Sequence, residues 1–211
     1  MLHGGAERGH GRVSRFSPPF LRTEVIARAA HRQLADAGVS VWSLRFCRSG
    51  WNGAEASPVP DARWALAEIA RRTRVGKGPG VPVVLVGHSM GGRTALRVAD
   101  DAAVRGLVLL APWLPPGEPM AELAGRDLVI AHGTRDRTTE PAASRRYAEQ
   151  AEGIARRVTH IDVPGEGHAL LRRPATWNRI VVESVLEILG APDAPDAPGA
   201  PDAPDRFDEA S

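Results

Sequence analysis

The 211-residue chain has a single cysteine and no long apolar run. With Cys47 alone, neither an intrachain disulfide nor a multi-cysteine metal site can form, which is typical of a reducing compartment. The first residues lack the apolar core of a signal peptide, and no stretch approaches the length of a membrane span. We therefore expect a cytoplasmic protein with no membrane partner and no metal site.

A clustered basic surface is also missing. The formal net charge is +2, and residues 191–211 contribute −5 of it (five Asp and one Glu against one Arg), which leaves +7 on residues 1–190. The arginines responsible are scattered along the chain, without the stacking aromatics or motifs of nucleic-acid-binding proteins. We expect a solvated basic surface and no nucleic-acid partner.

The chain has the length and apolar content, 43%, of one domain, expected over residues 1–190. Strand and helix patterns alternate along it, which predicts the α/β class: a mostly parallel sheet flanked by helices. Expected helices cover 19–37, 61–74, 93–100, 141–152 and 174–189, and expected strands cover 39–46, 81–86, 104–110, 127–131 and 157–163. Residues 191–211 repeat Ala-Pro-Asp and have too few apolar side chains to offset ordering entropy, so we expect a disordered tail.

The most informative motif is Gly87-x-Ser89-x-Gly91, which follows directly on the apolar, β-branched stretch 81–86. This order predicts a catalytic serine on a sharp strand-to-helix turn, where small residues on either side let the backbone reverse. A structural serine in an ordinary turn is the alternative, because so short a pattern also arises by chance. The strand before the motif and the helical pattern after it favour the nucleophile.

A serine nucleophile needs a histidine to take its proton and a carboxylate to orient that histidine. His168 lies in a glycine-rich loop after the last expected strand, and Asp136 lies just after the preceding strand. Carboxyl ends of parallel strands gather ligand sites at one edge of a sheet. The sequence therefore favours His168 as the general base and Asp136 as the triad acid.

Other residues of the same types remain as alternatives. Asp162 is the next acidic candidate, but it lies inside a strand pattern, and Asp136 could merely cap the segment that follows it. Of the other histidines, the sequence places His88 within the serine turn, where neighbours of the nucleophile pack, and His132 in a turn. His31 and His160 occupy surface or strand positions.

The order Ser89, Asp136, His168 resembles that of the α/β-hydrolase fold superfamily. The chain is similar to its small capless serine hydrolases, of the dienelactone-hydrolase-like or esterase type, from His3 to about Leu189. The resemblance rests on a His-Gly turn, Gly-His-Ser-Met-Gly-Gly, His-Gly-x-x-Asp and Gly-x-Gly-His. It implies hydrolysis of a small-molecule ester, thioester or amide through an acyl-enzyme, without cofactor. An acyltransferase, or an inactive module that binds a partner or ligand, remains an alternative.

An acyl-enzyme mechanism also needs backbone donors for the oxyanion. The amide of Met90, directly after the nucleophile, is the first expected donor; the resemblance implies Gly5 as the second, with Gly4 beside it at the substrate. Trp113 follows a strand end and is a candidate wall of the acyl pocket, although such an aromatic is as often core. Residues 111–125 are too few for a helical cap, so we expect an open cleft.

The chain departs from the family at its beginning. The family places two strands and a complete third strand ahead of the His-Gly turn, and here only Met1 and Leu2 precede His3. The third strand normally lies between the segments 39–46 and 81–86, so both are expected to have unpaired backbone groups. The hypothesis is that the written start lies inside a longer coding region, which the mass of the native protein tests.

Overall fold

A computed structural model describes residues 1–73 and 80–190, so the expected tail at 191–211 lies outside the described residues. The elements are α1 (Pro18–Leu34), α2 (Pro58–Thr73), β1 (Val83–His88), α3 (Met90–Arg97), β2 (Val104–Leu110), β3 (Asp127–Gly133), α4 (Pro141–Ala151), β4 (Arg157–Val163) and α5 (Pro174–Leu189). Short 3₁₀ turns lie at Ala35–Ala37, Gly53–Glu55 and Ala121–Leu123. No helix among the described residues is long and apolar enough to cross a membrane.

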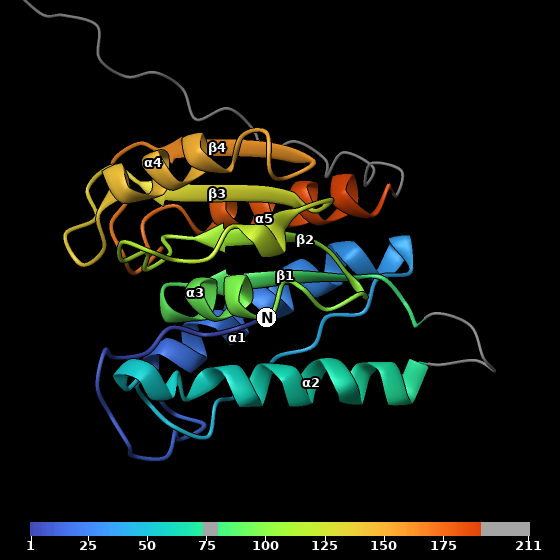
Figure 1. The fold of residues 1–211 in the computed structure, drawn as a ribbon, viewed down its shortest axis with the longest axis horizontal. Helices are drawn as coiled ribbons and strands as arrows, with labels where there is room; N and C mark the ends of the chain where they lie inside the picture. Colours follow the sequence, from blue (N-terminus) through green and yellow to red (C-terminus); the bar gives the residue numbers. More distant parts are fainter. Residues whose placement is uncertain (74–79, 191–211) are drawn as a thin grey trace, which may run out of the picture.

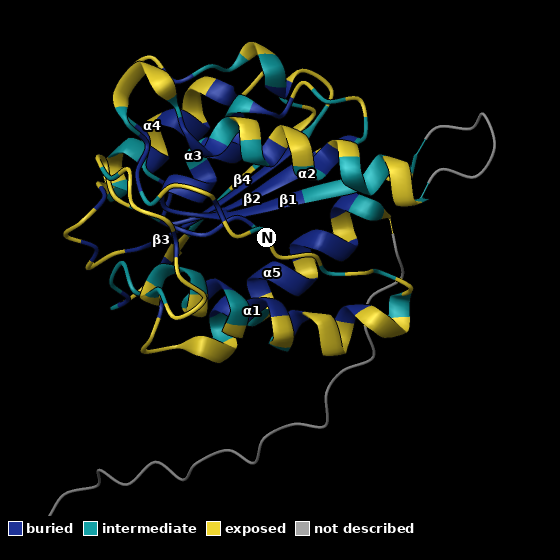
Figure 2. Ribbon diagram, turned by 90° about the horizontal axis from the view of Figure 1, so that it is seen from below, coloured by how far each residue is buried: buried dark blue, intermediate teal, exposed yellow. Residues whose placement is uncertain are grey.

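The four strands form one parallel sheet in the order β1-β2-β3-β4. Helices α3 and α4 cover one face with α2 beside α3, and α5 covers the other face with α1 packed against it (Figures 1 and 2). The predicted α/β architecture is thus confirmed.

Both faces of β2 and β3 are largely buried, which explains why these strands appear in the sequence as apolar runs, whereas the edge strand β4 exposes Arg157, Thr159 and Asp162. Along β2, Leu107 and Leu109 belong to the core under α3 and α4, whereas Val108 and Leu110 belong to the core that Trp177 of α5 completes. Figure 2 shows the buried strands between the two helical layers.

The predicted strand at 39–46 does not form. Only Leu44 makes a bridge, and its partner is Leu2, which also bridges Gly87 at the end of β1. A strand requires a neighbour along its whole length, and here two residues, Met1 and Leu2, lie between this segment and β1. A groove of about 580 Å³ remains beside β1, lined mainly by apolar side chains of the 39–44 segment, β1, α2 and α5.

The serine turn shifts two other boundaries. The expected strand 81–86 is β1 at Val83–His88, and the expected helix 93–100 is α3 at Met90–Arg97. The strand therefore continues to the residue before Ser89, and the helix begins at the residue after it. No loop separates the two elements.

Candidate active site

Ser89 occupies the turn between β1 and α3 with φ 54° and ψ −117°, a conformation that costs energy for any residue with a side chain. The two glycines of the motif make the turn possible. A Cβ on Gly87 would collide with the backbone of Gly91, and a Cβ on Gly91 would collide with the carbonyl of Leu2. The turn thus holds the Ser89 side chain at the carboxyl edge of the sheet, the arrangement predicted from the motif.

The structure brings the three predicted side chains into one hydrogen-bonded chain. The Ser89 hydroxyl lies 3.0 Å from Nε2 of His168, and Nδ1 of His168 lies 2.8 Å from Oδ2 of Asp136. With the imidazole protonated on Nδ1, the hydroxyl donates to Nε2 and Nδ1–H donates to the carboxylate. Asp162, the alternative acid, lies in β4 and pairs instead with Arg145.

The Asp136 carboxylate accepts hydrogen bonds on both oxygens. Besides His168, Oδ2 accepts from Nε2–H of His132 at 3.1 Å and from the Thr139 hydroxyl at 2.9 Å, while Oδ1 accepts from the amides of Thr138 and Thr139. Burial alone would raise the pKa of Asp136, but these donors outweigh it and hold the pKa well below its usual range. The group is therefore an ionised acceptor, suited to orient His168.

His132 is a functional candidate that the sequence analysis missed. It was expected in a turn, but it lies in β3, fully buried, with Nδ1 accepting from the Ser144 hydroxyl at 2.7 Å. This contact leaves Nε2–H free to donate to Asp136. The signal in the sequence is the spacing His132-x-x-x-Asp136 across a strand end, because one tight turn after the strand brings the two side chains together.

His88 anchors the loop that carries His168. Its Nε2–H donates to the carbonyl of His168 at 2.9 Å, and the two rings lie 4.9 Å apart. Burial lowers the pKa of His88 to about 3, so the ring is neutral near pH 7. A contact that spans 80 residues of sequence thus ties the residue before Ser89 to His168.

The His-Gly turn packs directly against the serine turn. A Cβ on Gly4 would come within 3.3 Å of the Cβ of Ser89, and a Cβ on Gly5 would collide with the side chain of Met90. Among the described residues, the amides of Gly4, Gly5 and Met90 donate to no protein acceptor. The amides of Gly5 and Met90, the two expected oxyanion donors, are therefore both without a protein acceptor among the described residues.

His3 sets the direction of the Gly4–Gly5 peptide. Its Nε2 accepts from the amide of Phe46 at 3.0 Å, so the proton lies on Nδ1 and is donated to the Gly4 carbonyl at 2.6 Å. The carbonyl and the N–H of a trans peptide point in opposite directions. With the Gly4 carbonyl held toward His3, the Gly5 N–H points away from it.

An aromatic cluster lies beside Ser89. The guanidinium of Arg93 lies over the rings of Trp51 and Trp113, at 3.9 and 4.4 Å from their centroids, and it pairs with the buried carboxylate of Glu118. The Trp113 amide donates to the Ser89 carbonyl at 3.2 Å. The half-buried Trp113 is thus fixed next to the serine turn, whereas Trp51 is buried in the core.

Comparison with known proteins identifies the family and the fold. Residues 1–149 match the model of the "Alpha/beta hydrolase family". An alpha-beta serine hydrolase homologue from Coxiella burnetii is similar over 76% of this chain and 76% of its own, at 17% identity and a TM-score of 0.59. A monoacylglycerol lipase from Paleococcus ferrophilus is similar over 89% of this chain and 100% of its own, at 17% identity and a TM-score of 0.58.

A putative hydrolase of the alpha/beta superfamily from Xanthomonas campestris pv. campestris is similar over 87% of this chain and 95% of its own, at 22% identity and a TM-score of 0.54. At these identities the solved structures establish the fold. No curated protein sequence matches the chain.

Proposed function

We propose that this chain, which belongs to the alpha/beta hydrolase family, is a serine hydrolase. In this proposal it cleaves an ester or thioester of a small to medium substrate through an acyl-enzyme. The observation that carries the proposal is the continuous hydrogen-bonded chain from the Ser89 hydroxyl through His168 to Asp136. A nucleophile, a base and an orienting acid in this sequence of contacts are what acyl transfer to serine requires.

In the proposed first step, the Ser89 oxygen attacks the substrate carbonyl while Nε2 of His168 takes the hydroxyl proton. The amides of Met90 and Gly5 donate to the oxyanion that develops, and His3 holds the second donor in place. His168 then gives its proton to the leaving alcohol or thiol, and the acyl group remains on Ser89. Water repeats the sequence with the same base and releases the acid.

Asp136 orients His168 and stabilises its protonated form without taking the proton itself. This role is consistent with the five hydrogen bonds that its carboxylate accepts. Gly4 and Trp113 are proposed to contact the substrate, because both lie against the serine turn. The segment 111–125 holds only the 3₁₀ turn Ala121–Leu123, and we infer a site without a helical cap.

A fluorophosphonate probe tests the proposal. We expect covalent labelling of Ser89 and turnover of p-nitrophenyl esters, both abolished by Ser89→Ala. The exposed Ser14→Ala is the matched control and should retain both. Undiminished labelling in Ser89→Ala would contradict the assignment of the nucleophile.

A hydrolase-fold module that binds a ligand without turnover is the second candidate. It is favoured by one observation: Leu2, which leads into the turn that carries Gly5, is the only described residue that bridges β1 on the side away from β2. Probe labelling without release of acid from any ester would favour this candidate, and multiple turnovers would exclude it. An acyltransferase would use the same residues and would reveal itself by acyl transfer to an added alcohol in preference to water.

A further inference from the structure

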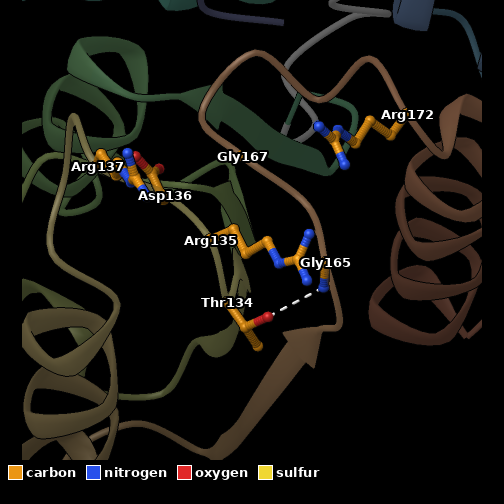
Figure 3. Close-up of a pocket in the computed structure, with 7 residues that line it drawn as sticks. All are labelled: Thr134, Arg135, Asp136, Arg137, Gly165, Gly167 and Arg172. Atoms are coloured by element: carbon orange, nitrogen blue, oxygen red, sulfur yellow. Dashed lines mark hydrogen bonds between the residues drawn. The ribbon is translucent and has the colours of Figure 1, made fainter.

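A second pocket adjoins the proposed triad on its acid side. It has a volume of about 670 Å³ and lies between the turn after β3 and the loop after β4 (Figure 3). Its lining consists of Thr134, Arg135, Asp136, Arg137, Gly165, Gly167 and Arg172. Asp136 is the proposed triad acid and Gly167 immediately precedes His168, so the pocket borders the two loops that carry the proposed acid and base.

Hydrogen bonds join the two walls of this pocket, the turn after β3 and the loop after β4. The Thr134 amide donates to the Val163 carbonyl at 3.1 Å, and the Arg135 amide donates to the Glu166 carbonyl at 2.8 Å. The Gly165 amide donates to the Thr134 hydroxyl at 3.0 Å, the contact drawn as a dashed line in Figure 3. The backbone that carries Arg135 is therefore fixed relative to the facing loop.

Three guanidinium groups line the pocket against one carboxylate. Arg135, Arg137 and Arg172 are all exposed, and none of them forms an ion pair with a carboxylate among residues 1–73 and 80–190. In Figure 3, the side chain of Arg135 extends toward Gly165, and that of Arg172 projects from the part of the facing loop that leads to α5.

Two arginines near the pocket form ion pairs, unlike those that line it. The one acidic residue of the lining, Asp136, already accepts hydrogen bonds from other residues. Arg145 pairs with Asp162 at 2.8 Å and Arg146 pairs with Glu140 at 3.2 Å. Both oxygens of Asp136 accept hydrogen bonds from elsewhere in the site. The pocket therefore has an excess of unmatched positive charge.

We propose that this pocket binds a carboxylate or phosphate group, and that the group is part of the substrate. Guanidinium groups match both anions through paired N–H donors, and the three that line this pocket supply such donors. The substrate part of the inference rests on the proposed function. It narrows the substrate class to esters or thioesters that carry an anionic group away from the scissile bond.

Matched esters test this inference at low ionic strength, where the attraction is least screened. The mono-p-nitrophenyl esters of adipate, pimelate and suberate are compared with the same compounds whose free carboxylate is capped as a methyl ester. We expect kcat/KM for at least one acid to exceed that of its neutral partner about tenfold. Arg135→Gln/Arg172→Gln should reduce this ratio to about one, whereas Arg179→Gln, on the exposed surface of α5, should keep it.

If the ratio of kcat/KM for the acid to that for its methyl ester is unchanged in the double variant, or if the wild type shows no preference for the acid, the substrate assignment is overturned.

Inorganic phosphate distinguishes an anionic group of the substrate from a free anion. Competition by phosphate against the anionic esters alone supports a substrate subsite. An equal effect of phosphate on neutral and anionic esters indicates a free effector and overturns that assignment.

Calorimetric titration with inorganic phosphate measures the pocket without catalysis. Binding to the wild type and to Arg179→Gln, with at least tenfold weaker binding to the double variant, supports the pocket as an anion site; equal binding to all three overturns it. If no ester is hydrolysed and no probe labels Ser89, the proposed function fails while this titration still decides the pocket.

Discussion

The two long sides of β1 differ in how they hold the site. On one side, β1 pairs with β2 from Val83 to His88, and the sheet continues to the strand ends that carry Asp136 and His168. On the other side, Leu2 is the only residue within 1–73 and 80–190 that bridges β1, and it leads into the turn that carries Gly5. The proposed proton-transfer residues thus follow fully paired strands, whereas the proposed oxyanion donor Gly5 depends on one bridge and on the contacts of His3.

The largest effect is expected on the complete side. Asp136→Asn should lower kcat about 10⁴-fold, because the amide favours the wrong tautomer of His168. Asp162→Asn, which removes only a surface ion pair, is the matched control and should retain full activity. Steady-state turnover of an activated ester measures both. Comparable losses in the two variants would contradict the choice of acid.

On the incomplete side, the expected loss is smaller. His3→Ala removes the donor that holds the Gly4 carbonyl, so the Gly5 amide loses its direction and kcat should fall about 10²-fold with little change in KM. His10→Ala, exposed in the same segment, is the control. Thermal unfolding of His3→Ala establishes that the tested protein is folded, and an unaltered kcat in that folded variant would argue against this role.

The buried imidazole of His88, at the end of β1, predicts how the free energy of unfolding varies with pH. The pKa of His88 is about 3 in the folded protein and about 6.5 in an unfolded chain. Between these values the unfolded chain binds the extra proton, so the free energy of unfolding decreases as the pH falls from about 6.5 toward 3. His88→Gln keeps a donor for the His168 carbonyl and should reduce this dependence by about 1.4 kcal/mol per pH unit. Denaturant unfolding at several pH values measures the slope; the wild-type slope in the variant would contradict the assignment.

Hydrogen exchange gives the most local comparison of the two sides. The amides of Val83 and Ser89 donate toward β2, and that of His88 donates to Leu2, so alternate amides of β1 face opposite sides. Val84 and Val86 therefore face the groove. We expect their amides to exchange about tenfold faster than that of Leu85, which faces β2. Equal protection of the three amides would mean that the groove side is as well ordered as the β2 ladder.

Local sequence patterns were sufficient to predict the bounds of elements that pack or pair along their whole length. The bounds of β2, β4 and α5 agree with the sequence because apolar runs, prolines and glycines mark them. The segment 39–46 has an equally clear alternation, but a strand exists only where a neighbour accepts its backbone hydrogen bonds. That condition lies outside the segment, so periodicity could not reveal its failure.

The site shows the same limit. Ser89, Asp136 and His168 were predicted from chain order and from their places at strand ends, and the structure brings them together. The contacts of His132 with Ser144 and of His88 with the His168 carbonyl depend on which residues face one another after folding. Residue type and spacing alone do not encode such pairings.

The backward bend of the chain at Ser89 has a consequence for measurement. The φ of 54° persists only while β1 and α3 are both in place, and the same folding brings His168 within reach of the hydroxyl. An unfolded molecule carries an ordinary, unreactive alcohol at this position. The fraction of molecules that a fluorophosphonate probe labels would therefore measure the folded fraction of a preparation.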